Sequence, residues 1–174
     1  MALDAPRHIY ARPWRIDVAT RRGVRSPLPL AALARLVAHA LTVCRAPSPA
    51  SLGLILSDDR ELAALNVKHM GHEGPTDVLS FPLLPVGAFP RHAGQDPTLR
   101  NDRSAGRFAL PPGRRPHLGD IIVSVERARA QADGSVEDEL RQLVVHGVLH
   151  VCGWDHAAPS ERAAMRALEG KVLA

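Results

Sequence analysis

The stretch from Ser135 to Val151 constrains the fold of this chain more than any other. Ser135 and Asp138 have the spacing of a capping box, which marks the start of a helix. Most of the apolar residues that follow form one stripe at helical spacing, and two more lie on the far side of the helix. The stripe consists of Val136, Leu140, Leu143, Val144, Gly147, Val148 and Val151, and the two others are Val145 and Leu149. A helix that is apolar on two faces must be buried, so we predict that it is central to the domain and ends before Gly153.

Segments of strand and helix character surround this central helix. We predict strands over residues 16–20, 52–56, 76–81 and 118–125, the last two as neighbours in one sheet. Helices are predicted from Pro29 to before Pro47, from the caps Ser57 and Asp58 to about Val67, and over residues 160–172. This order is typical of an α+β fold, with a mixed sheet of about four strands and helices packed on it. No linker separates a second unit, so residues 1–174 are expected to form a single domain.

The composition favours a soluble, cytoplasmic protein. The chain has no run of about 18 apolar residues that could span a membrane, and its N-terminus lacks the apolar stretch and cleavage site of a secretory signal. Its two cysteines, Cys44 and Cys152, lie far apart in the sequence and outside any Cys-x-x-Cys pair. We therefore expect two reduced thiols, and neither a disulfide scaffold nor a thiolate zinc site.

Residues 82–117 form a long basic segment that is rich in proline and glycine. The segment contains six arginines and two acidic residues, so it carries the whole net charge of +4 and the rest of the chain sums to zero. A connection of this length is unusual inside a compact domain, and we predict a flexible insertion. Its arginines, with Arg114 and Arg115 as candidates, are suited to binding the phosphates of a polyanion. The alternative is a solvated insertion without a binding role.

Three of the nine histidines lie between residues 146 and 156, and they indicate a metal site. His146 and His150 are four positions apart, so they project from one face of the predicted helix. Gly153 then reverses the chain and allows His156 to approach the same point. Two imidazoles on a nearly buried surface between apolar faces are costly to leave unpaired, and one divalent cation would satisfy both. The alternative is a pair of core histidines bonded to backbone carbonyls, with His156 unrelated to them.

The segment at 146–156 reads HGVLHVCGWDH and resembles the HGxLHxxGxDH signature of the YbeY family of bacterial metal-dependent endoribonucleases and ribosomal RNA maturation factors. Two further blocks, PTDVLSFP at 75–82 and LGDI at 118–121, are similar to blocks of the same family in the same order. The resemblance extends from about Leu52 to the C-terminus, without residues 82–117. It implies an α+β fold and one Zn²⁺ ion held by His146, His150 and His156.

The resemblance also implies a biological role. It indicates a single-strand-specific, zinc-dependent endoribonuclease involved in maturation of the 3′ end of 16S rRNA and in ribosome quality control. The expected partners are single-stranded RNA, ribosomal RNA and the small ribosomal subunit, and no membrane is involved. The alternative is a ribosome-assembly or RNA-binding factor with a structural zinc ion and little nuclease activity.

The predicted ligand set favours hydrolysis of an anionic substrate. Three protein ligands leave the fourth position of a tetrahedral zinc ion to water, and three neutral imidazoles leave the double charge of the ion intact, which favours a phosphodiester. The general base of HExxH peptidases is missing, because Gly147 follows the first histidine. We expect Asp155 to orient His156, with proton transfer as the alternative role.

Four other residues in or beside these motifs are predicted to be structural. Cys152 is interpreted as a small core residue rather than a fourth ligand, and Trp154 as a packing residue rather than a platform for base stacking. Asp77 and Asp120 are expected to make hydrogen bonds at strand ends rather than to act as acids in the reaction.

One position departs from the family pattern. Family members carry N-x-x-x-R-G just before the PTDVLSF block, and the arginine is associated with RNA; this chain has Met70 in its place. Methionine offers no charged fork to a phosphate, so the catalytic residues stay unassigned. Either Lys68, His69 or His72, or the arginines of residues 82–117, replace the missing contact, or nuclease activity is weak. Lys68, Arg114 and Arg115 are the predicted RNA-binding residues.

Overall fold

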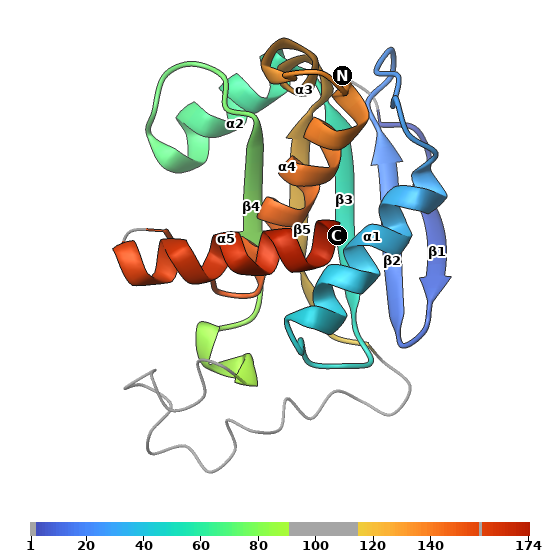
Figure 1. Ribbon diagram of the computed structural model, residues 1–174. Helices are drawn as coiled ribbons and strands as arrows, with labels where there is room; N and C mark the ends of the chain where they lie inside the picture. The colour runs from blue at the N-terminus through green and yellow to red at the C-terminus, as the bar shows by residue number, and fades with distance from the viewer. Residues whose placement is uncertain (1–2, 91–114, 157) are drawn as a thin grey trace.

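The computed structural model describes residues 3–90, 115–156 and 158–174, which build a mixed β-sheet with helices on both faces (Figure 1). In chain order the elements are β1 (Arg7–Ala11), β2 (Trp14–Thr20), α1 (Leu30–Val43), β3 (Ser51–Ser57), α2 (Asp59–Met70), β4 (Val78–Pro82), the 3-10 helix η1 (Val86–Ala88), β5 (His117–Ser124), α3 (Val125–Gln131), α4 (Val136–Val151) and α5 (Pro159–Leu173). The predicted α+β fold is confirmed.

The sheet has the strand order β1-β2-β3-β5-β4. Strands β2, β3 and β5 run parallel, and β1 and β4 are antiparallel edge strands. The four predicted strands correspond to β2, β3, β4 and β5, and the predicted neighbours β4 and β5 are paired. The fifth strand, β1, was not predicted. Its residues are largely exposed, so it lacks the alternation of apolar and polar side chains by which half-buried strands are recognised.

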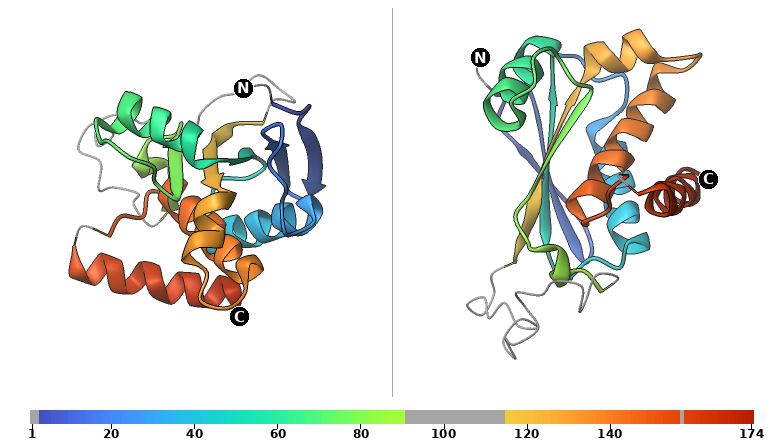
Figure 2. Two further views of the ribbon diagram at one scale, coloured as in Figure 1. Left: turned by 90° about the horizontal axis from the view of Figure 1, so that it is seen from above. Right: turned by 90° about the vertical axis from the view of Figure 1, so that its left-hand side faces the viewer.

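Helices cover the two faces of the sheet unequally (Figure 2). On one face, α1, α4 and α5 enclose the main hydrophobic core, to which the strands contribute fully buried residues such as Ile16, Leu54 and Ile121. On the other face lies α2, with a smaller buried cluster of Leu62, Leu79 and Ile122. Successive side chains of a strand point to opposite faces, so β3, β4 and β5 supply residues to both layers.

Helix α4 is the central helix of the larger layer, as predicted. Ser135 caps it, since its hydroxyl oxygen accepts a hydrogen bond from the N–H of Asp138 at 3.2 Å. The buried residues are Leu140, Leu143, Val144, Val145, Gly147, Val148, Leu149 and Val151. Gly147 permits close approach to the sheet, because a Cβ atom there would lie 2.6 Å from Cγ2 of Ile121. Beyond the helix, Gly153 has a φ of +83°, the left-handed conformation expected at a helix end.

The predicted insertion at 82–117 is described only at its two ends. Phe89, in the first part, is 2% exposed and packs into the main core. Residues 91–114, which include Arg114, lie outside the described residues, so the flexibility of the insertion stays a prediction. In the part of the chain that the structure describes, no helix is long and apolar enough to cross a membrane.

Candidate metal centre

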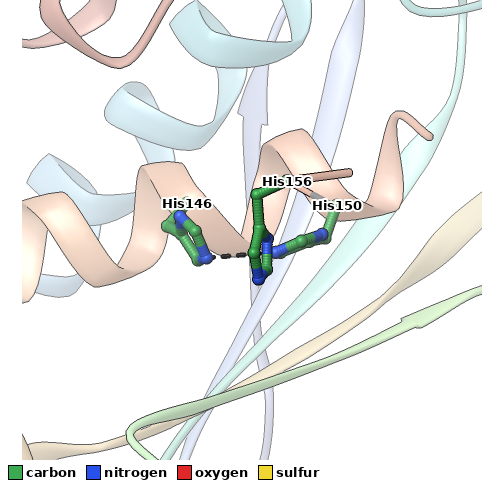
Figure 3. A group of neighbouring side chains, drawn as sticks. All are labelled: His146, His150 and His156. Carbon is green, nitrogen blue, oxygen red and sulfur yellow. Dashed lines mark hydrogen bonds between the residues drawn. The ribbon is translucent and has the colours of Figure 1, made fainter. Parts of the chain in front are cut away.

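The three predicted ligands converge on one point (Figure 3). His146 and His150 project from α4, one turn apart, and His156 approaches from the loop that follows Gly153. One ring nitrogen of each residue lies within 4.8 Å of the others, and no fourth histidine, cysteine or carboxylate of the described residues joins the group. The spacing predicted from the sequence is therefore realised in space.

Hydrogen bonds at the back of two rings determine which nitrogens face the centre. Nδ1 of His146 lies 2.7 Å from Oε1 of Glu169, and Nδ1 of His150 lies 2.9 Å from the carbonyl oxygen of Trp154. Both partners accept, so both Nδ1 atoms carry the proton. The two Nε2 atoms then face each other at 3.0 Å with lone pairs only. This arrangement fits a bound cation, because tetrahedral zinc separates its nitrogen ligands by roughly 3.3 Å.

A proton is less suited than a metal ion to lie between His146 and His150, because protonation of His150 is disfavoured. Burial holds the pKa of His150 below its ordinary value, and the neighbouring His146 lowers it further. A neutral imidazole is the form that binds a metal ion. The donor set therefore fits zinc or another divalent cation that accepts nitrogen ligands.

The surroundings of the site are more open than the sequence suggested. The predicted nearly buried surface is only half-buried, since the side chain of His146 is 32% exposed and that of His156 is 54% exposed. Two hollows of about 390 and 510 Å³ meet at these residues, and Asp77 also lines both. The centre is therefore accessible from solvent, as a catalytic site requires and a closed structural site does not.

Asp155 lies beside the third ligand. Its carboxylate accepts a hydrogen bond from the backbone N–H of His156 at 2.7 Å and lies 3.9 Å from Nδ1 of the same residue. The carboxylate thus bonds to the backbone of the ligand residue rather than directly to its ring. The predicted orienting role of Asp155 stays a prediction.

The residue that orients His146 was missed in the sequence analysis. Glu169 belongs to α5, 23 positions beyond its partner, and its side chain is 16% exposed. Carboxylates that accept the second ring proton of a ligand histidine fix the ring and raise its basicity. No short-range spacing links Glu169 to the signature at 146–156, because packing of α5 against α4 creates the contact.

Structural roles are confirmed for the two residues beside the ligands. Cys152 is 1% exposed and lies outside the group of candidate ligands, and a hydrogen bond with Cys44 and burial raise the pKa of its thiol well above the ordinary value. Trp154 is 7% exposed and belongs to the main core. The two cysteines, distant in sequence, are therefore neighbours in the fold.

The two predicted strand-end aspartates lie in different places. Oδ1 of Asp77 accepts from the N–H of Val78 at 2.8 Å and from the hydroxyl of Thr76 at 3.3 Å, which is a turn role, although the residue also borders the metal centre. Asp120 lies 3.0 Å from Nε2 of His117 in a different hollow. Asp120 is thus remote from the histidine cluster.

Two of the predicted RNA-binding residues, Lys68 and Arg115, do not line the hollows at the metal centre. Lys68 is exposed on α2, and Arg115 donates a hydrogen bond to the carbonyl oxygen of Pro13 at 2.6 Å. Arg114 lies outside the described residues. Met70, in contrast, lines the larger hollow together with all three histidines. The family arginine position is therefore part of the site, and it is occupied by an uncharged side chain.

Comparisons with known proteins identify the family of this chain. A family model described as endoribonuclease YbeY matches residues 23–174. A Thermobifida fusca protein named endoribonuclease YbeY is 37% identical over 164 residues, which are 91% of this chain and 92% of the relative. The chain belongs to the YbeY family. Relatives of the same name from Salinispora tropica and Roseiflexus sp. are 39% and 40% identical over 78% and 72% of this chain, and over 80% and 69% of their own lengths.

A solved structure shares the fold of this chain. The solution structure of a Thermotoga maritima protein matches with a TM-score of 0.50 and 23% identity, and the match covers 92% of this chain and 86% of that one. The family match begins at residue 23, so it extends further towards the N-terminus than the resemblance that began at about Leu52.

Proposed function

We propose that this YbeY family member is a zinc-dependent endoribonuclease that cleaves single-stranded RNA. The observation that carries the proposal is the pair of Nε2 lone pairs of His146 and His150, 3.0 Å apart, with His156 beside them. One cation relieves the repulsion between these lone pairs. With three protein ligands, one coordination position is left for solvent or for a phosphate oxygen.

The chain's own residues hold and orient this centre. When bound, zinc would supply a Lewis acid and lower the pKa of a bound water molecule towards ~7. Glu169 fixes the ring of His146, and the carbonyl of Trp154 fixes that of His150. We propose that Asp155 restrains the loop that carries His156. The residue that accepts the proton from the attacking water is left unassigned.

The substrate class rests on charge and on the family. Neutral imidazole ligands leave a doubly positive centre, which favours an anionic phosphodiester over a neutral amide. Position 147 is also unsuited to a peptidase base, because a side chain there would point into Ile121 of the sheet rather than towards the metal. We propose the 3′ end of 16S rRNA as the substrate, in rRNA maturation and ribosome quality control. The small ribosomal subunit is the proposed partner and the cytoplasm the proposed location.

Cleavage of a labelled single-stranded RNA by purified protein tests this function. Wild-type protein loaded with zinc is expected to cleave the RNA, whereas His146→Ala and metal-stripped protein are expected to be inactive. His39→Ala, an exposed histidine on α1, is the matched control and keeps full activity. Equal cleavage by all four preparations would contradict the proposal.

The second candidate is an RNA-binding assembly factor with a structural zinc ion. Met70 favours this candidate, since the larger hollow has methionine where the family pattern has an arginine, whose guanidinium group can bind a phosphate. In that case, metal removal would lower the melting temperature strongly and cleavage would be absent, while co-sedimentation with small ribosomal subunits would persist. Lys68, Arg114 and Arg115 are the proposed RNA contacts, and their substitution would weaken co-sedimentation.

A further inference from the structure

Helix α5 crosses the end of α4 (Figure 1), and hydrogen bonds join one of its faces to residues of the metal centre. Arg162 Nε donates a hydrogen bond to the backbone carbonyl of His156 at 3.1 Å, and Glu169 accepts one from His146 at 2.7 Å. These two residues of α5 are separated by about two helical turns, so they share one face. Arg166 lies between them on that face, four positions after Arg162 and three before Glu169. The helix is thus held against two of the three ligand residues.

Both arginines of this face border the centre. Arg162 and Arg166 line the hollow of about 390 Å³ that also contains His146 and His156. Both are exposed, and the ion pairs between described residues include neither of them. The two carboxylates of the hollow are engaged elsewhere, Glu169 with His146 and Asp77 with the N–H of Val78. Two guanidinium groups are therefore left to interact with a ligand in this hollow.

The opposite side of the centre lacks such charge. The hollow of about 510 Å³ between α2, β4 and α4 has no lysine or arginine among its described lining residues, and Met70 stands at the family arginine position. Among the described residues that line these two hollows, arginine side chains therefore occur only on the α5 side of the centre.

We propose that Arg166, together with Arg162, binds the phosphate oxygens of the RNA strand on the α5 side of the metal centre, and so replaces the contact that Met70 cannot make. This inference rests on the proposed function and names two positioning residues of the same site. A guanidinium group donates paired, charge-assisted hydrogen bonds to a phosphate. Such contacts place the strand without reading its bases. Arg162 keeps its terminal nitrogens for this role, since its bond to His156 uses Nε.

The direct test is RNA binding as a function of salt. The affinity of the zinc-loaded protein for a fluorescent single-stranded RNA is measured by anisotropy at several salt concentrations. Arg166→Gln and Arg162→Gln are each expected to raise Kd about tenfold. Each is also expected to reduce the slope of log K against log salt by about 0.7, the value for one lost phosphate contact with a single strand.

Two further variants separate a phosphate contact from a structural role. Arg166→Lys keeps the charge and loses the fork, so it is expected to retain the wild-type salt slope with a smaller loss of affinity. Arg60→Gln removes one exposed arginine at the start of α2, outside both hollows, and is the matched charge control. Its Kd and salt slope are expected to equal those of the wild type. Bound zinc and melting temperature are measured for every variant.

The outcomes separate this inference from the proposed function. If the wild type binds RNA with the expected differences in salt slope but does not cleave it, the nuclease assignment fails and the role of the arginines stands. If the wild type cleaves RNA, and Arg166→Gln and Arg162→Gln match Arg60→Gln in Kd, salt slope and cleavage rate, the inference is overturned and the nuclease assignment stands.

Discussion

The two faces of the sheet differ in how many buried residues pack against them. The face under α1, α4 and α5 has the main core, and the metal ligands lie at its margin. The face under α2 has a small apolar cluster, and the partly exposed pair of His117 and Asp120 lies on the same face. Two of the three candidate ligands, His146 and His150, are thus carried by a helix that is packed on several sides, whereas the second face has only a small buried cluster. Rigid support for the ligands is what a preorganised metal site needs.

Truncation of one buried leucine on each face is expected to have the largest effect on stability and tests this difference directly. Leu149 in α4 and Leu62 in α2 are both fully buried. Leu149→Ala is expected to lower the free energy of unfolding by about 3–5 kcal/mol, and Leu62→Ala by about 2 kcal/mol, because the smaller cluster can relax around a cavity. Urea denaturation monitored by circular dichroism measures both. Equal losses would contradict the view that the α2 face is the more adaptable.

A methyl group added to one glycine on each face is the next largest perturbation. A Cβ atom at Gly147 would lie 2.6 Å from Cγ2 of Ile121 and 3.1 Å from Cγ2 of Val78, whereas at Gly53 it would meet the carboxylate of Asp120. Gly147→Ala is expected to cost about 2–3 kcal/mol of unfolding free energy through overpacking. Gly53→Ala is expected to cost less than ~1 kcal/mol, since the half-buried carboxylate of Asp120 is the end of a side chain that can rotate away. Thermal unfolding of both variants measures the two losses of unfolding free energy. A larger loss in Gly53→Ala than in Gly147→Ala would contradict the expected difference between the faces.

Removal of the negative charge of Glu169, which accepts a hydrogen bond from His146, tests how residues on the main-core face support metal binding. Glu169→Gln keeps the size of the side chain but weakens the bond that fixes His146. We expect metal affinity to fall about 10- to 100-fold, with little change in stability. Competition with a chromophoric chelator measures the affinity. The control is Glu73→Gln, which alters an exposed residue between α2 and β4. Equal metal affinity in the two variants would show that Glu169 does not support metal binding.

The smallest expected effect is a pH dependence on the second face. A hydrogen bond with Asp120 raises the pKa of His117, so the charged ring is favoured in the folded state. The stabilisation is fully present below the pKa of the unfolded state and is lost as pH rises through the higher folded value. The side chains are 34% and 42% exposed, so solvent screening limits the effect to less than ~1 kcal/mol. Asp120→Asn is expected to flatten the change in unfolding free energy between pH 5.5 and 8, and an unchanged pH profile would argue against the pair.

Much of the site could be predicted because its determinants are local. The cap at Ser135, the four-residue spacing of His146 and His150, and the left-handed turn at Gly153 each depend on neighbours within one or two helical turns. The four strands with apolar side chains on the core face were predicted for the same reason. Strand β1 was missed because pairing with β2, rather than its own pattern of burial, makes it a strand.

What the sequence by itself determined is the central helix, its two apolar faces and the three candidate ligands, since helical periodicity places His146 and His150 on one face and Gly153 turns the chain towards them. The tertiary structure alone decided what surrounds them. Glu169 and Arg166 lie at the centre because α5 packs against α4. Cys44 contacts Cys152 because α1 also packs against α4. Such contacts join residues that are far apart in the chain, and their positions follow from how helices pack over the whole core rather than from any repeat in the sequence.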